Sequence, residues 1–177
     1  MKAILLDLDG TLVDTEKLDD ITMQKVLKTN GLLKSKKFIG YTLEEYVKAI
    51  TKDKKFQNKI KNGFIKEYEK ILEKTELKIN HQLLKLLKRE NDVKIALVTS
   101  NNKRLTSFIL TKLGIKKFFD IIVTCEDVEN QKPHPEPYLR AIKRLNINPK
   151  DCIAFEDSKQ GMLSAKSAGI KIIKKLV

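Results

Sequence analysis

The chain has 177 residues, of which 41% are hydrophobic, and its formal net charge is +13. This length allows one domain, or one domain with a sizeable insertion, and the chain contains no run of roughly 18 apolar residues that could cross a membrane. The first apolar run, Ala3–Leu6, is too short for the roughly 7–15-residue core of a secretory signal, so we expect a cytoplasmic protein. Basic residues come in pairs such as Lys36–Lys37, and acids are interspersed among them. This pattern favours a composition that is rich in lysine without a function for the charge, rather than a nucleic-acid-binding surface.

Five short apolar runs are predicted to be strands, because of their length and their β-branched content. They are Ala3–Leu8, Val93–Thr99, Ile121–Thr124, Cys152–Phe155 and Ile170–Ile173. Between the later runs the apolar spacing is helical: one helix should end at Gly114, and another should begin near Pro137. Apolar strands that alternate with helices predict an α/β fold, a Rossmann-like parallel sheet with helices on both faces.

The long interval between the first two strands has a helical pattern instead. It is too long for one crossover or for a structureless loop. Thr42 and Glu45 are spaced as a capping box at the start of one helix, and in the next helix apolar residues recur every four positions, at Phe56, Ile60, Phe64, Tyr68 and Leu72. We therefore predict a small all-helical cap domain over residues 15–79, inserted into a core made of residues 1–14 and 80–177.

The ends of this insertion give two further expectations. Asp14 is a hinge residue or, as we favour, the N-terminal cap of the first inserted helix, Thr15–Asn30. After the insertion, the segment His81–Arg89 is predicted to be a helix that leads back into the sheet.

Acidic and hydroxyl side chains follow the predicted strands. They are Asp7 and Asp9 after the first strand, Thr99, Ser100 and Asn101 at the end of the second, and Glu156 and Asp157 after the fourth. Lys132 follows the third strand. Ligands bind outside the carboxyl ends of the strands in open parallel sheets, so we expect these side chains to converge on one site.

In this order, the segments resemble the haloacid dehalogenase superfamily of phosphotransferases, over nearly the whole chain. DLDGTLVDT resembles the first motif of that family, IALVTSN the second, QKPHPEPYL the third and FEDSKQGMLSAKSAG the fourth. The insertion falls where members with a helical cap have theirs, and FIGYTLEEY is similar to a segment common in such caps.

The resemblance implies a phosphoryl-transfer enzyme, with Asp7 as the nucleophile that forms an aspartyl phosphate. Asp9 would protonate the leaving oxygen and then accept a proton from the hydrolytic water. Members that cleave carbon–halogen bonds lack this second aspartate, so its presence favours phosphate chemistry. Mg²⁺, a cation that prefers hard oxygen ligands, is the implied cofactor.

Further residues receive roles from the same resemblance. The Asp7 carboxylate, the Asp9 backbone carbonyl and the Asp157 carboxylate would bind Mg²⁺, and Glu156 would act through a metal-bound water. Thr99, Ser100 and Lys132 would hold the phosphoryl oxygens, with Asn101 as a further candidate. Gly10 would let the chain turn sharply at the strand end.

The expected activity is hydrolysis of a small phosphorylated metabolite. A β-phosphoglucomutase-like sugar-phosphate mutase uses the same motifs and remains an alternative, and a basic, non-catalytic binding protein on the same scaffold is an alternative of another class. We expect a monomer that does not bind membranes. The cysteines, Cys125 and Cys152, have no metal-site spacing, and both are expected to be buried free thiols.

Overall fold

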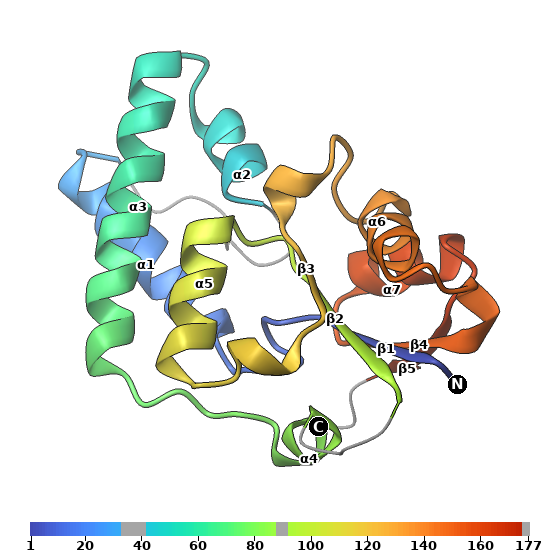
Figure 1. Cartoon of the computed structure of the whole chain (residues 1–177). Coiled ribbons are helices and arrows are strands. Elements are labelled where there is room, and N and C mark those ends of the chain that lie inside the picture. The colour runs from blue at the N-terminus through green and yellow to red at the C-terminus, as the bar shows by residue number, and fades with distance from the viewer. Residues whose placement is uncertain (33–41, 88–91, 175–177) are drawn as a thin grey trace. The chain divides into compact units, whose positions relative to one another are not determined.

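The computed structural model describes residues 1–32, 42–87 and 92–174 (Figure 1). The chain divides into two compact units, one of Met1–Asp14 with Lys78–Val177 and the other of Thr15–Leu77. We call the first the α/β unit and the second the helical unit. The segment FIGY of the predicted cap motif lies outside the described residues. Among the described residues, no helix is both long and apolar enough to span a bilayer.

The α/β unit is built on one parallel sheet of five strands in the order β3-β2-β1-β4-β5. The strands are β1 (Ala3–Leu6), β2 (Lys94–Val98), β3 (Ile121–Val123), β4 (Cys152–Glu156) and β5 (Lys171–Lys174). All five predicted strands are therefore confirmed, although β1 ends two residues earlier than expected. The Asp7 N–H still donates to the Phe155 carbonyl at 3.1 Å, so Asp7 stands directly at the carboxyl end of the central strand.

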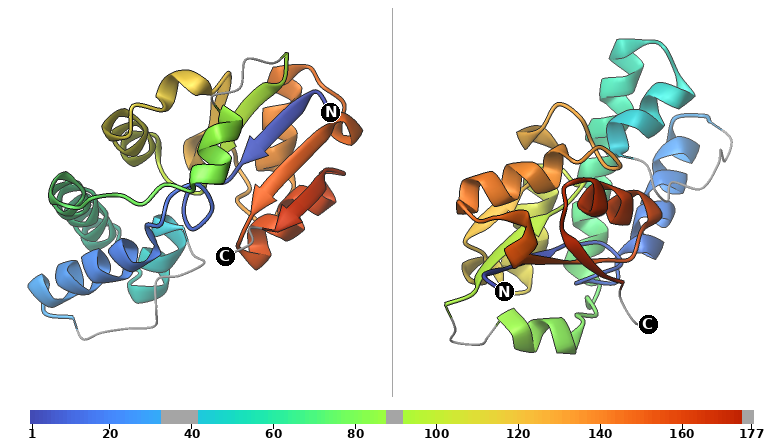
Figure 2. Two further views of the ribbon diagram at one scale, coloured as in Figure 1. Left: turned by 90° about the horizontal axis from the view of Figure 1, so that it is seen from below. Right: turned by 90° about the vertical axis from the view of Figure 1, so that its right-hand side faces the viewer.

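Helices cover both faces of this sheet. They are α4 (His81–Leu87), α5 (Lys103–Lys112), α6 (Glu136–Leu145) and α7 (Lys159–Ser167), with short 3₁₀ turns η1 (Lys116–Phe118), η2 (Cys125–Asp127) and η3 (Pro149–Asp151). α6 packs against β2 and β3, and α7 packs against β4 and β5. Figure 2 shows α6 and α7 together on one face and α4 on the other. The predicted last residues of α4 lie outside the described part of the chain.

Alternation of side chains along the strands explains this coverage. Ala3 and Leu5 of β1 join one core cluster with residues of α6 and α7, while Ile4 and Leu6 are also buried and point to the other face. Both faces of the strand are thus apolar, as the sequence predicted for a parallel sheet.

The helical unit contains α1 (Glu16–Thr29), α2 (Leu43–Ile50) and α3 (Lys54–Lys74), and α3 packs against both other helices. The four-residue spacing along α3 is confirmed for four of its five residues, because Ile60, Phe64, Tyr68 and Leu72 are buried, whereas Phe56 in the first turn is half-buried. The predicted capping box is also confirmed: the Thr42 hydroxyl accepts from the Glu45 N–H at 3.2 Å, and the Glu45 carboxylate accepts from the Thr42 N–H at 2.9 Å.

The expected Asp14 cap is wrong. Thr15 occupies the N-cap position of α1, and Asp14 belongs to the α/β unit. The Asp14 N–H donates to the Lys78 carbonyl at 3.0 Å, and Val13 pairs antiparallel with Ile79. This pairing also moves Lys78 and Ile79 out of the insertion, where we had placed them. We call these paired residues, Val13–Asp14 and Lys78–Ile79, the neck.

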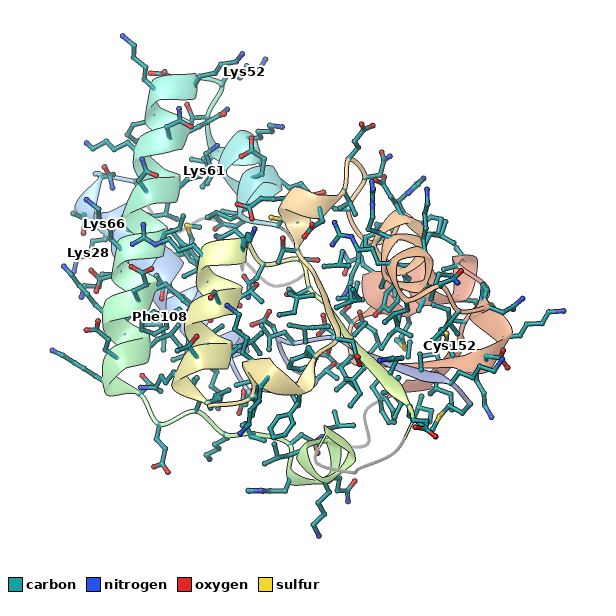
Figure 3. All side chains as sticks on the ribbon, in the orientation of Figure 1. Lys28, Lys52, Lys61, Lys66, Phe108 and Cys152 are labelled. Carbon is teal, nitrogen blue, oxygen red and sulfur yellow. The ribbon has the colours of Figure 1, made fainter. Side chains whose placement is uncertain are left out.

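The surface charges of the helical unit are dispersed. Figure 3 shows Lys52 beside the start of α3, away from Lys28 on α1 and Lys66 on α3. Some lysines pair with acids, as Lys25 does with Glu67 at 2.5 Å. Such exposed pairs contribute roughly 0–1 kcal/mol each to the free energy of unfolding. They show that some of the acids neutralise neighbouring lysines, and they do not indicate a function.

Both cysteines are free thiols, as predicted. Cys152 is buried in β4, and burial raises the pKa of its thiol. Cys125, in η2, is only half-buried, so the expectation that both would be buried is wrong for this residue.

Gly63, in the middle of α3, allows a direct test of helix packing in the helical unit. A Cβ at this position would have its nearest contact with Val26 Cγ1 at 3.4 Å, which is ordinary van der Waals distance. Because glycine costs a helix roughly 0.8–1.0 kcal/mol relative to alanine, we expect Gly63→Ala to raise the free energy of unfolding by about 0.5–1 kcal/mol. Urea denaturation followed by circular dichroism measures this change.

Gly114 is the matched control for this substitution. It ends α5 with φ +65°, and a Cβ there would have no neighbour within 4 Å. Because the left-handed conformation costs a non-glycine residue roughly 1–2 kcal/mol, Gly114→Ala should destabilise the protein although space is available. Changes of the same sign in both variants would contradict this account.

Candidate active site

The carboxyl ends of two adjacent strands bring charged side chains together in the α/β unit. Asp7 follows β1, and Glu156 and Asp157 lie at the end of β4, the neighbouring strand. One carboxylate oxygen from each of these three residues lies within 4.8 Å of the other two. Carboxylates this close cannot all stay charged unless positive charge lies nearby.

Lys132 supplies part of this positive charge. Its ammonium donates to Asp7 Oδ1 at 2.8 Å, to Glu156 Oε1 at 2.5 Å and to the Val98 carbonyl at 2.9 Å. The Lys132 side chain is only 5% exposed. Burial alone would lower the pKa of Lys132, but the carboxylates of Asp7 and Glu156 raise it above its ordinary value, so the ammonium stays charged.

One ammonium does not balance the cluster. Burial, followed by repulsion from Glu156, holds the pKa of Asp7 well above its usual range, although the charge of Lys132 opposes this shift. A further cation would remove the excess negative charge. The donors are carboxylate oxygens, the ligand type that Mg²⁺ prefers, so these residues fit a divalent cation of that kind.

Glu156 is fully buried, and several groups define its position. The Tyr138 hydroxyl, from α6, donates to Glu156 Oε1 at 2.8 Å, and the Ser158 hydroxyl donates to Oε2 at 3.2 Å. Gly161, in the first turn of α7, lies against the carboxylate: an added Cβ would be 1.9 Å from Oε1 and 2.0 Å from Cδ. Only a residue without a side chain fits there.

Asp9 contacts residues that follow β2. The Asn101 side-chain amide donates to Asp9 Oδ2 at 2.7 Å, and the Thr99 hydroxyl lies 3.4 Å from the same oxygen. The Asn101 N–H in turn donates to Thr99 Oγ1 at 3.0 Å. Ser100 is half-buried between them. Gly10, with φ +76°, then turns the chain away from the sheet as predicted.

The two remaining elements of the site are also fixed locally. The buried Thr11 hydroxyl donates to Asp157 Oδ1 at 2.8 Å. The loop before Lys132 is tied to the start of α6. The Glu136 carboxylate, in α6, accepts from the N–H groups of Glu129 and Asn130 in that loop, each at 2.9 Å. These hydrogen bonds hold the pKa of Glu136 at about 2, so this connection persists through the neutral range.

Comparison with known proteins identifies the family. Residues 4–175 match the family model for haloacid dehalogenase-like hydrolases. The chain belongs to this family. A curated relative, the phosphorylated carbohydrates phosphatase of Thermotoga maritima, is 32% identical over 98% of this chain and 84% of its own length.

Solved structures show the same fold. CbbY from Rhodobacter sphaeroides, crystallised in complex with phosphate, superimposes with a TM-score of 0.89 at 22% identity, over 100% of this chain and 87% of its own. A β-phosphoglucomutase from Clostridium difficile superimposes with a TM-score of 0.85 at 24% identity, over 98% of this chain and 84% of its own.

The structure of this haloacid dehalogenase-like hydrolase brings most of the predicted site residues into contact, in two groups. Asp7, Lys132, Glu156 and Asp157 form one group, and Asp9, Thr99 and Asn101 form the other. Within the described residues, Ser100 makes no hydrogen bond to either group. Asn101, which is predicted to bind substrate, contacts the Asp9 carboxylate.

Sequence reasoning missed four residues of the site: Thr11, Tyr138, Ser158 and Gly161. Gly161 had a visible signal, since glycine inside a helical stretch is costly and usually has a packing reason. Thr11 lies in the DLDGT segment with Asp7 and Asp9, and Ser158 directly follows Asp157. Tyr138 gave no signal, because its spacing matched an ordinary apolar helix face.

The close contact at Gly161 predicts a large effect of a small substitution. Gly161→Ala should displace the Glu156 carboxylate, cost about 1–3 kcal/mol through overpacking, and lower hydrolytic activity, because Lys132 loses one of its acceptors. Thermal unfolding and turnover of a model phosphate ester measure both effects. Gly63→Ala is the matched control in the helical unit. Wild-type stability of Gly161→Ala would show that Glu156 is not fixed as described.

Proposed function

We propose that this hydrolase is a Mg²⁺-dependent phosphatase that acts on a small phosphorylated metabolite through an aspartyl-phosphate intermediate at Asp7. The main support is the arrangement at the end of β1, where Asp7 accepts from the buried Lys132 ammonium while Asp9, two residues later, accepts from the Asn101 amide. Two carboxylates in different environments are suited to different roles. The phosphatase among the named relatives supports the same chemistry.

In the proposed reaction, the second oxygen of Asp7 attacks phosphorus, and the bond from phosphorus to the ester oxygen breaks. Asp9 donates its proton to that leaving oxygen, and later accepts a proton from the water that attacks the aspartyl phosphate. Inorganic phosphate and free Asp7 result. Lys132 and Thr99 stabilise the charge on the phosphoryl oxygens.

The Asp7 and Asp157 carboxylates and the Asp9 backbone carbonyl are the proposed ligands of Mg²⁺. When bound, the ion supplies positive charge that reduces repulsion between Asp7 and the phosphate dianion. Glu156 is also close enough to be considered, but one of its oxygens already accepts from Lys132 and Tyr138. We therefore propose that Glu156 acts indirectly, by contacting a water bound to the ion.

Mg²⁺ should stabilise the folded protein in a pH-dependent way. Because the pKa of Asp7 is raised in the metal-free fold, charging this carboxyl as pH rises through the raised pKa destabilises that fold. Mg²⁺ offsets the charge, so its stabilising effect should grow from acidic to neutral pH. At about a hundredfold excess over Kd it should reach about 2.7 kcal/mol.

Thermal unfolding in EDTA and in Mg²⁺, at acidic and neutral pH, measures this effect. Asp157→Ala should lose most of the stabilisation, whereas Asp151→Ala, a change of the same charge at an acid of η3 beside β4, should retain it. Turnover of p-nitrophenyl phosphate should stop in EDTA and return with Mg²⁺. Full activity in EDTA would reject the metal assignment.

Asp7 and Asp9 should be separable by mutation. Asp7→Asn removes the nucleophile and should leave almost no turnover and no phosphoenzyme. Asp9→Asn removes only proton transfer, which is worth roughly 10²–10⁴-fold in rate, and should still bind Mg²⁺ through its backbone carbonyl. With p-nitrophenyl phosphate, whose leaving group needs little protonation, Asp9→Asn should accumulate the phosphoenzyme.

Mass spectrometry of quenched single-turnover samples locates the phosphate. A label on Asp7 supports the assignment, and a label on Asp9 or Thr99 contradicts it.

We further propose that the helical unit is a cap that determines substrate specificity, since the residues at the strand ends are generic to phosphoryl chemistry. A small metabolite is then the expected substrate, and the protein is expected to be a cytoplasmic monomer without a nucleic-acid partner. A screen of phosphorylated metabolites tests this proposal. Faster hydrolysis of a folded phosphoprotein than of every small ester would contradict it.

The competing candidate is a sugar-phosphate mutase. It is retained because a β-phosphoglucomutase has the same fold and because the proposed roles of Asp7 and Asp9 serve both reactions. Incubation with a hexose 1-phosphate and catalytic hexose bisphosphate separates the two: release of inorganic phosphate supports the phosphatase, and conversion to the 6-phosphate supports the mutase.

A further inference from the structure

Tyr138 connects two charged groups of the site without being one of the predicted site residues. It lies in α6, its side chain is fully buried, and its hydroxyl donates to Glu156 Oε1 at 2.8 Å. Its ring also faces the Lys132 ammonium, which lies 5.3 Å from the ring centroid. Tyr138 therefore contacts Lys132 in two ways, directly through the ring and indirectly through Glu156.

Lys132 needs such support because its side chain is long and flexible. An ammonium has three N–H donors, and here they are directed to three acceptors, on Asp7, Val98 and Glu156. The Val98 acceptor is a backbone carbonyl of β2, and the pairing of Val98 with Val123 fixes its place. The Glu156 acceptor is a side-chain carboxylate, so the place of the ammonium beside Asp7 depends on what fixes Glu156.

Glu156 is fixed from several sides. Tyr138 and Lys132 share one of its oxygens, Ser158 donates to the other, and Gly161 leaves space for the carboxylate but not for any side chain of its own. Among these groups, the Tyr138 hydroxyl alone shares the oxygen that accepts from Lys132. Its removal would free that oxygen to rotate away and take the ammonium with it.

We propose that Tyr138 is a positioning residue for phosphoryl transfer: its hydroxyl and ring fix Glu156 and Lys132 so that the ammonium stays against the nucleophile Asp7. This inference rests on the proposed function for its catalytic consequence. The geometric part, the placement of Lys132, does not depend on which reaction the enzyme performs.

Two substitutions separate the contributions of the hydroxyl and the ring. Tyr138→Phe keeps the ring over Lys132 and removes the hydrogen bond to Glu156, whereas Tyr138→Leu removes both. Tyr68→Phe is the matched control, because Tyr68 is also a fully buried tyrosine, in α3 of the helical unit. It reports the effect of deleting a buried tyrosine hydroxyl that does not belong to the contacts of Glu156.

Two measurements are made on each full-length variant. The first is kcat for p-nitrophenyl phosphate with Mg²⁺, which should fall about tenfold in Tyr138→Phe, fall further in Tyr138→Leu, and remain unchanged in Tyr68→Phe. The second is the rate of reductive methylation of the Lys132 amine, followed by peptide mass spectrometry. This rate should rise severalfold in both Tyr138 variants and stay at the wild-type rate in Tyr68→Phe. Each protein is measured at the same number of degrees below its own melting temperature.

The two readouts distinguish failure of this inference from failure of the proposed function. If the wild type does not hydrolyse phosphate esters, the proposed function fails, and the methylation rate alone decides whether Tyr138 positions Lys132. Equal methylation of Lys132 in Tyr138→Phe and Tyr68→Phe overturns the inference. An active enzyme whose kcat is unaffected by Tyr138→Phe overturns it as well, because the hydroxyl would then contribute only to stability.

Discussion

The contact between the buried Lys132 ammonium and the Asp7 carboxylate is the interaction on which the other features of the site depend. Without it, two carboxylates at the ends of neighbouring strands would face each other with no buried positive charge between them, and such groups protonate or turn outward. The single ammonium brings Asp7 and Glu156 together but leaves the cluster with excess negative charge. This excess negative charge is the basis of the proposed cation site.

Sheet order determines how this contact can form. β1 lies in the centre, between β2 and β4, so Asp7 has one neighbour that supplies the Val98 carbonyl and another that supplies Glu156. Parallel strands end at the same edge, and their buried positions leave the backbone little freedom. The flexible Lys132 side chain is thus placed by acceptors on rigid elements, while its own loop is held by Glu136.

The parts of this arrangement that follow from local pattern could be predicted, and the parts that depend on three-dimensional packing could not. The five strands, the Thr42 capping box and the buried face of α3 are encoded in short-range spacing. The expected Asp14 cap failed because a good capping residue is also acceptable in a turn, and the pairing of Val13 with Ile79 decided the matter. The role of Tyr138 could not be predicted, because helical periodicity indicates that a side chain is buried but not which polar group its hydroxyl contacts.

The neck has a consequence for how this protein can change over evolutionary time. Both crossings into the helical unit leave the α/β unit at an antiparallel pair, where Asp14 bonds to Lys78. The two ends of the insertion therefore start side by side, and a segment of different length or sequence could be joined there without altering the register of β1. Selection can then act on the insertion as a replaceable module while the charged edge of the sheet is inherited unchanged.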